Sequence, residues 1–111
     1  PFKKQNSFLA MTAHIIYNSI DPVNTATHSH KIIKLIRNKI GFKNIIMSDD
    51  ISMKALKYSV SSNTTLAFKA GCDLVLHCNG KYKEMLMVAK NSPLLSSFII
   101  KKTSQLVNII R

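Results

Sequence analysis

The stretch GFKNIIMSDDISM, residues 41–53, decides the fold that this sequence predicts. Gly41 is a residue that commonly ends a helix, and an apolar run at residues 45–47 follows it closely. Strands that are buried on both faces of a parallel sheet have continuous apolar runs of this kind. The run leads directly into Ser48 and two adjacent carboxylates, and polar chemistry collects where such strands end. This stretch therefore predicts a buried strand with a candidate site at its carboxyl end.

The two carboxylates, Asp49 and Asp50, are predicted to have different roles. Side chains alternate in direction along a strand, so Asp49 shares a side with Met47 while Asp50 faces the other way. They are therefore not expected to be a facing pair of acid and base. One is expected to enter a site and the other to support the turn. The alternative is that both aspartates cap a helix that begins at Ser52.

The rest of the chain alternates between strand patterns and helix patterns. The sequence predicts strands near residues 8–14, 44–48 and 73–78, a helix capped by Thr27 or Ser29 and ended by Gly41, and helices over about 63–70, 82–89 and from Ser96 or Ser97 onward. Strands separated by helices are joined by right-handed crossovers into a parallel sheet. The predicted fold class is therefore α/β, with parallel strands.

Polar side chains follow all three predicted strands. They are His14 after the first, Asp49 and Asp50 after the second, and His77, Cys78 and Asn79 after the third. In a parallel sheet these ends share one edge, so the residues are expected to converge on a site. His14, Asp49 and His77 could alternatively be metal ligands, but no local spacing matches a known metal motif. No phosphate-binding glycine loop is present either, so we expect neither a metal nor a cofactor.

The composition indicates one small globular domain. The 111 residues are 46% hydrophobic, and no apolar run approaches the roughly 20 residues that span a membrane. The short apolar patch near the start is not typical of a signal peptide, so we expect a cytoplasmic protein. The net charge of +11 raises the alternative of a small basic module that binds nucleic acid or an anionic glycan. The lysines are scattered along the sequence, however, and no specific nucleic-acid site is expected.

The two cysteines are predicted to be free, buried thiols. Cys72 and Cys78 both fall in the run AGCDLVLHC, which has the pattern of a buried strand. Two positions six residues apart on one strand are separated by roughly 20 Å, which is too far for a disulfide. Free thiols are typical of a reducing compartment.

Three motifs resemble one enzyme family in order and spacing. The segment GF-x-x-x-I-x-SDD-x-SM, within residues 41–53, is similar to the nucleophile motif of bacterial β-N-acetylhexosaminidases of glycoside hydrolase family 3. The preceding AMTAHIIY, residues 10–17, resembles the segment one βα unit earlier in those enzymes. The following AGCDLVLHCN, residues 70–79, resembles the segment one unit later. The resemblance covers most of the chain up to about Asn79, and the tail only loosely.

The resemblance implies a fold, a reaction and two site residues. Members of the family fold as a (β/α)8 barrel and release terminal β-linked N-acetylglucosamine with retention, and the bacterial cytoplasmic branch acts on peptidoglycan fragments. Residues 1–111 would be a C-terminal fragment of that barrel and carry about its last three βα units. By the resemblance, Asp49 is the catalytic nucleophile and His14 lies in the substrate-binding site. The implied partner is a saccharide that contains N-acetylglucosamine, such as a muropeptide.

The sequence departs from the family pattern in one large respect. A K-H-F-P-G-H-G segment and a loop with a D-x-H dyad, which supply sugar contacts and the general acid/base in the family, are absent from these 111 residues. We therefore expect the chain to be inactive alone and to need an N-terminal chain that completes the barrel. Two alternatives stay open, which are the basic binding module and a gene remnant without function.

Overall fold

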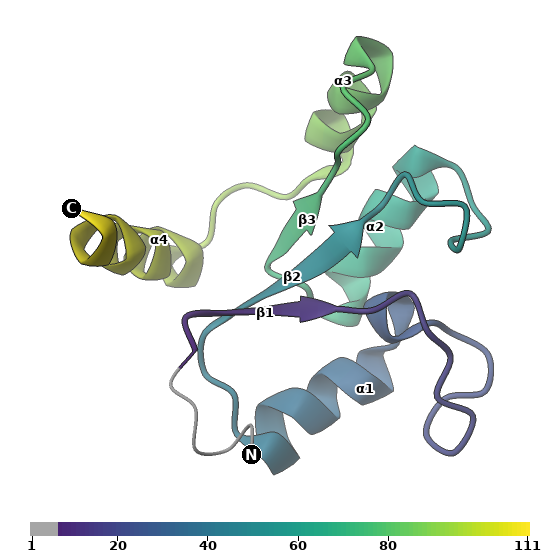
Figure 1. Ribbon diagram of the computed structural model, residues 1–111, viewed down its shortest axis with the longest axis horizontal. Coiled ribbons are helices and arrows are strands. Elements are labelled where there is room, and N and C mark those ends of the chain that lie inside the picture. The colour runs from purple at the N-terminus through teal and green to yellow at the C-terminus, as the bar shows by residue number, and fades with distance from the viewer. Residues whose placement is uncertain (1–6) are drawn as a thin grey trace.

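The computed structural model describes residues 7–111 as an α/β fold built on a three-stranded parallel sheet (Figure 1). The strands are β1 (Leu9–Thr12), β2 (Ile45–Asp50) and β3 (Leu74–Leu76). The helices are α1 (His30–Leu35), α2 (Val60–Ala70), α3 (Tyr82–Asn91) and α4 (Ser97–Ile110), with a short 3-10 helix η2 (Ala26–His28) before α1 and a π-helical turn η3 (Ile36–Ile40) after it.

The order of the strands in the sheet is β1-β2-β3, and both pairs are parallel, which confirms the predicted topology. Two strands are shorter than predicted, since β1 ends at Thr12 and β3 ends at Leu76. In contrast, β2 continues through both aspartates to Asp50. The alternative in which a helix begins at Ser52 is therefore wrong, because that residue lies in a turn and α2 begins only at Val60.

Serine caps and glycine ends define the helices. The Ser29 hydroxyl accepts a hydrogen bond from the amide of Ile32 at the start of α1, and Gly41 ends the helical segment in the left-handed region with φ 79°. Ser59 caps α2 in the same way, and the helix begins at Val60, three residues before the predicted start. Gly71 ends α2 with φ 116°, where a Cβ atom would also lie 2.8 Å from the Ile33 side chain.

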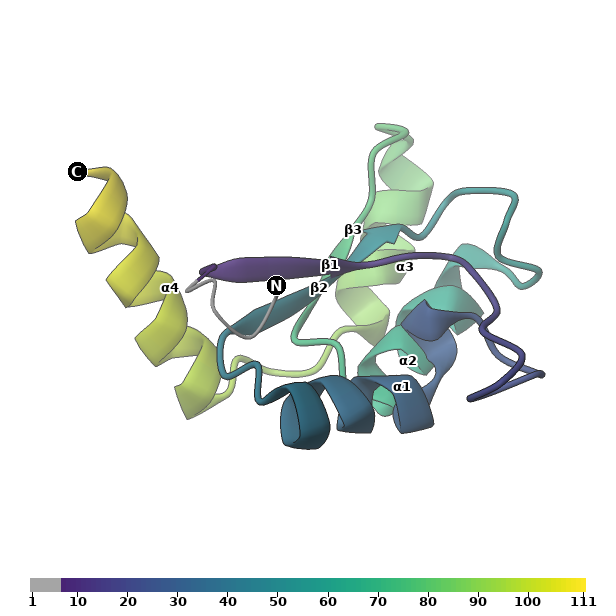
Figure 2. The ribbon, with the colours of Figure 1, turned by 60° about the horizontal axis from the view of Figure 1, so that its bottom comes forward.

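One face of the sheet packs against α1 and α2, which Figure 2 shows together beneath the strands. The hydrophobic core lies there and consists of Ile33, Ile46, Ala67, Ala70 and Cys72. Ile46 is the residue of the central strand β2 in this core, and burial of one such side chain stabilises the fold by about 1.5–3 kcal/mol.

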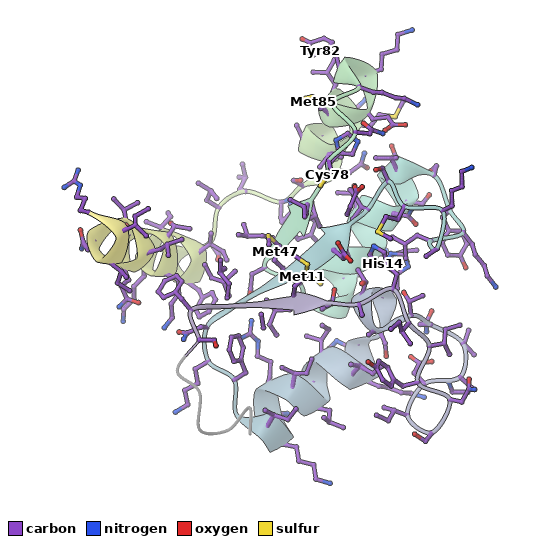
Figure 3. The ribbon with its side chains drawn as sticks, in the orientation of Figure 1. Met11, His14, Met47, Cys78, Tyr82 and Met85 are labelled. Atoms are coloured by element: carbon purple, nitrogen blue, oxygen red, sulfur yellow. The ribbon has the colours of Figure 1, made fainter. Side chains whose placement is uncertain are left out.

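The opposite face of the sheet is uncovered toward Met11, although Ile45 at the start of β2 is fully buried. Met11 of β1 pairs in register with Met47 of β2, and Met47 pairs with Leu74 of β3. Since Ile46 points into the helix-covered core, its neighbour Met47 points to the other side. Figure 3 labels Met11 and Met47 on adjacent strands, and Met11 is 54% exposed. We call this row of apolar side chains the open face.

The edge of the sheet where the strands begin, here called the amino edge, is held by an ion pair. The Arg37 guanidinium donates to the Asp73 carboxylate and to the main-chain oxygens of Phe42 and Asn44. The same Asp73 carboxylate accepts a hydrogen bond from the Ile46 amide at 2.8 Å. One carboxylate therefore joins the starts of β2 and β3 to η3.

Helix α4 contacts the amino edge and otherwise stands apart from the sheet (Figure 1). The Lys102 ammonium donates to the Asn44 side chain at 2.8 Å, and the Phe98 ring lies 5.7 Å from the Arg37 guanidinium carbon. Much of the apolar surface of α4 is exposed, since Ile99 is its one buried residue while Ile110 is 73% exposed.

The prediction that both cysteines are buried was wrong for one of them. Cys72 precedes β3 and is buried, whereas Cys78 follows β3 and is exposed, because the strand ends two residues earlier than expected. Neither cysteine forms a disulfide in the described part of the chain, as predicted. Within residues 7–111, no helix combines the length and apolar character needed to cross a bilayer.

Candidate active site

The three strand ends meet at the opposite edge of the sheet, here called the carboxyl edge. Figure 3 shows His14 and Cys78 beyond the ends of β1 and β3, on the same side of the sheet. The His14 Nε2 atom lies 2.8 Å from the main-chain oxygen of Asp50, and the Cys78 amide donates to the Asp50 carboxylate at 3.2 Å. Asp50 therefore links the ends of all three strands.

The Asp50 carboxylate is occupied by structural hydrogen bonds. It accepts the amide of Ser52 at 3.0 Å, the Ser52 hydroxyl at 2.7 Å and the Cys78 amide. Burial raises the pKa of the Asp50 carboxyl, but these hydrogen bonds and the nearby His77 outweigh burial and hold the pKa below its usual value. Asp50 is thus the carboxylate that supports the turn, as the alternation of side chains had predicted for one of the two.

The Asp49 carboxylate is much less occupied. Among the hydrogen bonds of the described residues it takes part in one, in which the amide of Asp50 donates to its Oδ1 atom at 2.8 Å. The side chain is partly exposed. The pairing of β2 with β3 shifts register between Met47 and Asp50, so Asp49 lies at an irregularity of the strand, a feature that redirects side chains next to active sites. A partly exposed carboxylate with a spare oxygen at a strand end is able to act as a nucleophile toward an electrophilic carbon.

His14 lies close to the nucleophile candidate but uses both ring nitrogens within the protein. Its Nδ1 atom lies 2.8 Å from the Thr27 hydroxyl, and its Nε2 atom contacts the Asp50 main-chain oxygen. The hydroxyl of Thr12, at the end of β1, lies 2.8 Å from that of Thr27. Both threonines are buried, so the imidazole is fixed from its inner side.

The side chain of His77 contacts α3. Its Nε2 atom lies 2.9 Å from a carboxylate oxygen of Glu84 on α3, and Asn79 donates to the same oxygen. The hydrogen bonds from Asn79 and His77 lower the pKa of the Glu84 carboxyl. Within residues 7–111, no three His, Cys, Asp or Glu side chains are grouped closely enough to hold a metal ion. His14, Asp49 and His77 are therefore not assembled as a ligand set.

Three residues of this edge were not found from the sequence. Thr12 lies within the AMTAHIIY segment but was assigned no role, Thr27 was considered only as a helix cap, and Glu84 is one of several charged residues on a helix. Each becomes part of the edge through a contact between segments that are separated along the chain, so no local pattern could have identified it.

Comparison with known proteins gives a consistent result. The glycosyl hydrolase family 3 N-terminal domain matches residues 2–109. A β-hexosaminidase of Nitrosomonas eutropha is 43% identical over 72 residues, which are 62% of this chain and 20% of that protein. A β-hexosaminidase of Vibrio cholerae is 33% identical over 87 residues, which are 77% of this chain and 26% of that protein.

Solved structures show the same similarity. A family 3 β-N-acetylglucosaminidase from Paenibacillus matches with a TM-score of 0.74 and 25% identity, over 91% of this chain and 21% of that one. A β-N-acetylhexosaminidase from Beutenbergia cavernae matches with a TM-score of 0.71 and 25% identity, over 94% of this chain and 33% of that one. The chain thus spans between a fifth and a third of the length of these relatives. The family match over nearly all 111 residues, on a fold with the expected parallel strands, means that the chain belongs to the glycosyl hydrolase family 3 N-terminal domain family.

Proposed function

We propose that this chain supplies the nucleophile of a retaining β-N-acetylhexosaminidase, and that the nucleophile is Asp49. The observation that carries the proposal is the difference between the two adjacent carboxylates at the end of β2. Asp50 is saturated by hydrogen bonds from the protein, while Asp49 accepts one and keeps an oxygen for chemistry. The β-hexosaminidases and β-N-acetylglucosaminidases to which the chain is similar supply the reaction class.

The reaction requires two groups with opposite properties. Asp49 attacks the anomeric carbon of the sugar and forms a covalent glycosyl-enzyme, which water then hydrolyses. An acid must protonate the leaving oxygen in the first step, and it must hold its proton near neutral pH. Asp50 is unsuited to that task because its lowered pKa keeps it ionised. We propose that a segment outside these 111 residues supplies the acid.

The three βα units are proposed to be the sixth to eighth of a (β/α)8 barrel. The open face that carries Met11 and Met47 would then line the interior of the barrel, since the other face is already covered by α1 and α2. The structural matches to between a fifth and a third of longer enzymes support this assignment. An N-terminal segment, on the same or another chain, would add strands to the free edges of β1 and β3.

The proposed substrate is a saccharide with a terminal β-linked N-acetylglucosamine, such as a muropeptide released from peptidoglycan. The β-hexosaminidases and β-N-acetylglucosaminidases that the chain resembles support N-acetylglucosamine as the sugar. We propose a role in the recycling of the cell wall because the family resemblance is to the bacterial enzymes that act on peptidoglycan fragments. Two free thiols, at Cys72 and Cys78, are consistent with the reducing environment of the cytoplasm. His14 is proposed to border the sugar site near Asp49 without a hydrogen bond to the sugar, since both ring nitrogens contact the protein.

The test is turnover of an aryl β-N-acetylglucosaminide by the purified chain, alone and together with a segment that completes the barrel. We expect no turnover by the chain alone, because acid assistance is worth about 10²–10⁴-fold and the sugar-positioning groups are also absent. Turnover is expected after completion and should be abolished by Asp49→Asn. Turnover by the isolated chain that depends on Asp49 would contradict the proposal that the acid lies elsewhere.

A further inference from the structure

The contacts of His14 define which of its nitrogens carries a proton. The main-chain oxygen of Asp50 can only accept a hydrogen bond, so Nε2, at 2.8 Å, must be the donor. In the neutral ring the other nitrogen, Nδ1, is then an acceptor, and the Thr27 hydroxyl at 2.8 Å is able to donate to it. Neutral His14 is therefore held in the Nε2–H tautomer.

Buried threonines anchor the imidazole on its inner side. Thr27 is fully buried and Thr12 is 6% exposed, and their hydroxyls are 2.8 Å apart. The single Thr27 hydroxyl proton has two acceptors in reach, the Ala13 main-chain oxygen at 3.2 Å and His14 Nδ1 at the shorter distance of 2.8 Å. With that proton directed to His14, the Thr12 hydroxyl is able to donate to Thr27. The hydrogen bonds then run in one direction, from Thr12 through Thr27 and His14 to the Asp50 carbonyl. Hydroxyl and imidazole groups aligned in this way polarise one another and rigidify the site.

The last link reaches the nucleophile candidate through the main chain of Asp50. Its carbonyl accepts from His14, and its amide donates to the Asp49 Oδ1 atom at 2.8 Å. The backbone of this single residue is therefore held at its carbonyl by His14, at 2.8 Å, and by the Met53 amide, at 3.2 Å, while its own amide orients the carboxylate of Asp49. The Asp50 side chain is held independently by Ser52 and Cys78.

From this geometry we propose that His14 is a positioning residue, which fixes the Asp50 backbone and thereby the orientation of the Asp49 carboxylate, with Thr27 and Thr12 holding its tautomer. Both nitrogens serve the protein, so the ring has no free N–H group or lone pair with which to bind a sugar hydroxyl. The importance of His14 for catalysis rests on the proposed function of Asp49. The hydrogen bonds from Thr12 through Thr27 and His14 to Asp50 can be tested whether or not the chain is an enzyme.

The first experiment therefore needs no substrate. Long-range ¹H–¹⁵N spectra of the ¹⁵N-labelled chain distinguish the two neutral histidine tautomers. His14 should show a protonated Nε2 and an unprotonated Nδ1. His30 is the internal control, because it is exposed and its Nδ1 atom is the one near a carbonyl, that of Ala70 at 3.3 Å. A protonated Nδ1 on neutral His14, or the averaged tautomers of a free imidazole, would overturn the proposal even if the chain proves to be an enzyme.

Variants extend the test to the Asp49 carboxylate. Glutamine at position 14 can place an N–H donor near the position of Nε2, whereas alanine cannot. His14→Ala should shift the Asp50 amide and Asp49 carboxyl resonances and speed exchange of the Asp50 amide, His14→Gln should restore most of both, and His30→Ala should change neither. Unchanged Asp50 and Asp49 resonances in a folded His14→Ala chain would contradict the proposal. Should His14→Ala fail to fold, the tautomer and the His14→Gln spectra decide it.

Activity of the completed barrel provides a separate readout. A misplaced carboxylate lowers the rate of the chemical step more than it weakens substrate binding, so His14→Ala should reduce kcat by about 10–100-fold with little change in KM. A large rise in KM with unchanged kcat would instead identify His14 as a substrate contact and overturn the proposal. Absence of activity in the unmodified protein would count against the proposed function, while the spectra would still decide the role of His14.

Discussion

Both edges of the sheet depend on aspartates, but the aspartates are used differently. At the amino edge, Asp73 pairs with Arg37 and accepts the Ile46 amide, so its carboxylate is consumed by contacts that join strands and helix. At the carboxyl edge, Asp50 is consumed in the same way by Ser52 and Cys78. Asp49, its neighbour along β2, accepts a single hydrogen bond from an adjacent amide.

The comparison shows that residue type and burial alone do not distinguish structure from function here. Asp49, Asp50 and Asp73 are the same residue type, and each has intermediate burial. They differ in how many protein donors each carboxylate satisfies and in which edge of the sheet it occupies. Active sites of parallel α/β folds lie at the carboxyl ends of strands, and the spare acceptor capacity is found at that edge.

The largest effect should follow from removal of the spare carboxylate. Asp49→Asn in the completed barrel should lower kcat by about 10⁴-fold or more, since loss of a covalent nucleophile removes the main reaction path. Because the Asp49 carboxylate accepts one hydrogen bond, Asp49→Asn should alter the free energy of unfolding by no more than about 0.5 kcal/mol. Turnover of an aryl glycoside and urea unfolding measure the two quantities. An Asp49→Asn variant that loses stability and keeps activity would show that Asp49 is a structural carboxylate and not the nucleophile.

Loss of the carboxylate at the amino edge should have the opposite result. Asp73→Ala leaves the Ile46 amide without its side-chain acceptor and removes one of the three acceptors of the Arg37 guanidinium, and a buried donor left unpaired costs about 1–3 kcal/mol. The urea midpoint should fall while the slope of the transition stays the same. In the completed barrel, kcat per folded molecule should remain close to that of the parent. A stability equal to the parent's would show that this ion pair does not hold the edge.

Acid should weaken the carboxylates that serve structure. Asp21, in the loop after β1, accepts hydrogen bonds from the Ser29 hydroxyl and the amides of Asn24 and Val23, and these hold the pKa of its carboxyl well below the ordinary value of 3.8. A folded pKa below the unfolded one contributes stability that is complete above about pH 4 and is lost as pH falls toward the folded value. The lowered pKa of Asp50 acts with the same sign.

The measurement is the free energy of unfolding between pH 5 and pH 2.5 for the parent, Asp21→Asn and Asp50→Asn. Each variant should lose less stability on acidification than the parent does, because it lacks one group that must be protonated. A parent whose stability rises as the pH falls through this range would contradict the assignment of these carboxylates as structural.

The smallest effect concerns the cysteines that flank β3 at the two edges. Burial raises the pKa of the Cys72 thiol to about 12, so iodoacetamide at pH 8 should not modify it in the folded chain. Cys78 is exposed at the carboxyl edge and should react. Mass spectrometry should find one modified thiol under native conditions and two in denaturant, with Cys78→Ser as the control. Rapid modification of both under native conditions would contradict the packing of the core.

Much of the fold could be predicted because its signals are local. Ser29, Gly41 and Ser96 mark helix ends by their own chemistry, and the apolar run before Ser48 marks the central strand. The start of α2 was missed because Val60, Ser61 and Ser62 are weak helix formers, and it is the cap by Ser59 that makes the first turn favourable. The shortness of β3 could not be predicted, since the Cys78 amide bonds to the distant Asp50 carboxylate.

The site could be predicted only as a set of residues at one edge. The prediction that the two aspartates differ agrees with their contacts, since Asp50 accepts the Ser52 amide and Asp49 accepts only the amide of Asp50 among the described residues. The contacts of His14 could not be deduced, since Thr27 and Asp50 lie 13 and 36 residues away in the sequence. The roles of Asp49 and His14 in catalysis remain predictions that the experiments above address.

The central claim is that Asp49, and not its neighbour Asp50, forms the covalent bond to the sugar. The most direct test treats the completed barrel with a 5-fluoro N-acetylglucosaminyl fluoride, which slows hydrolysis of a glycosyl-enzyme enough for it to be trapped, and identifies the labelled residue by peptide mass spectrometry. We predict one label, on the Asp49 carboxylate, and none in Asp49→Asn. A label on Asp50 or on any other residue, or full activity in Asp49→Asn, would contradict the account.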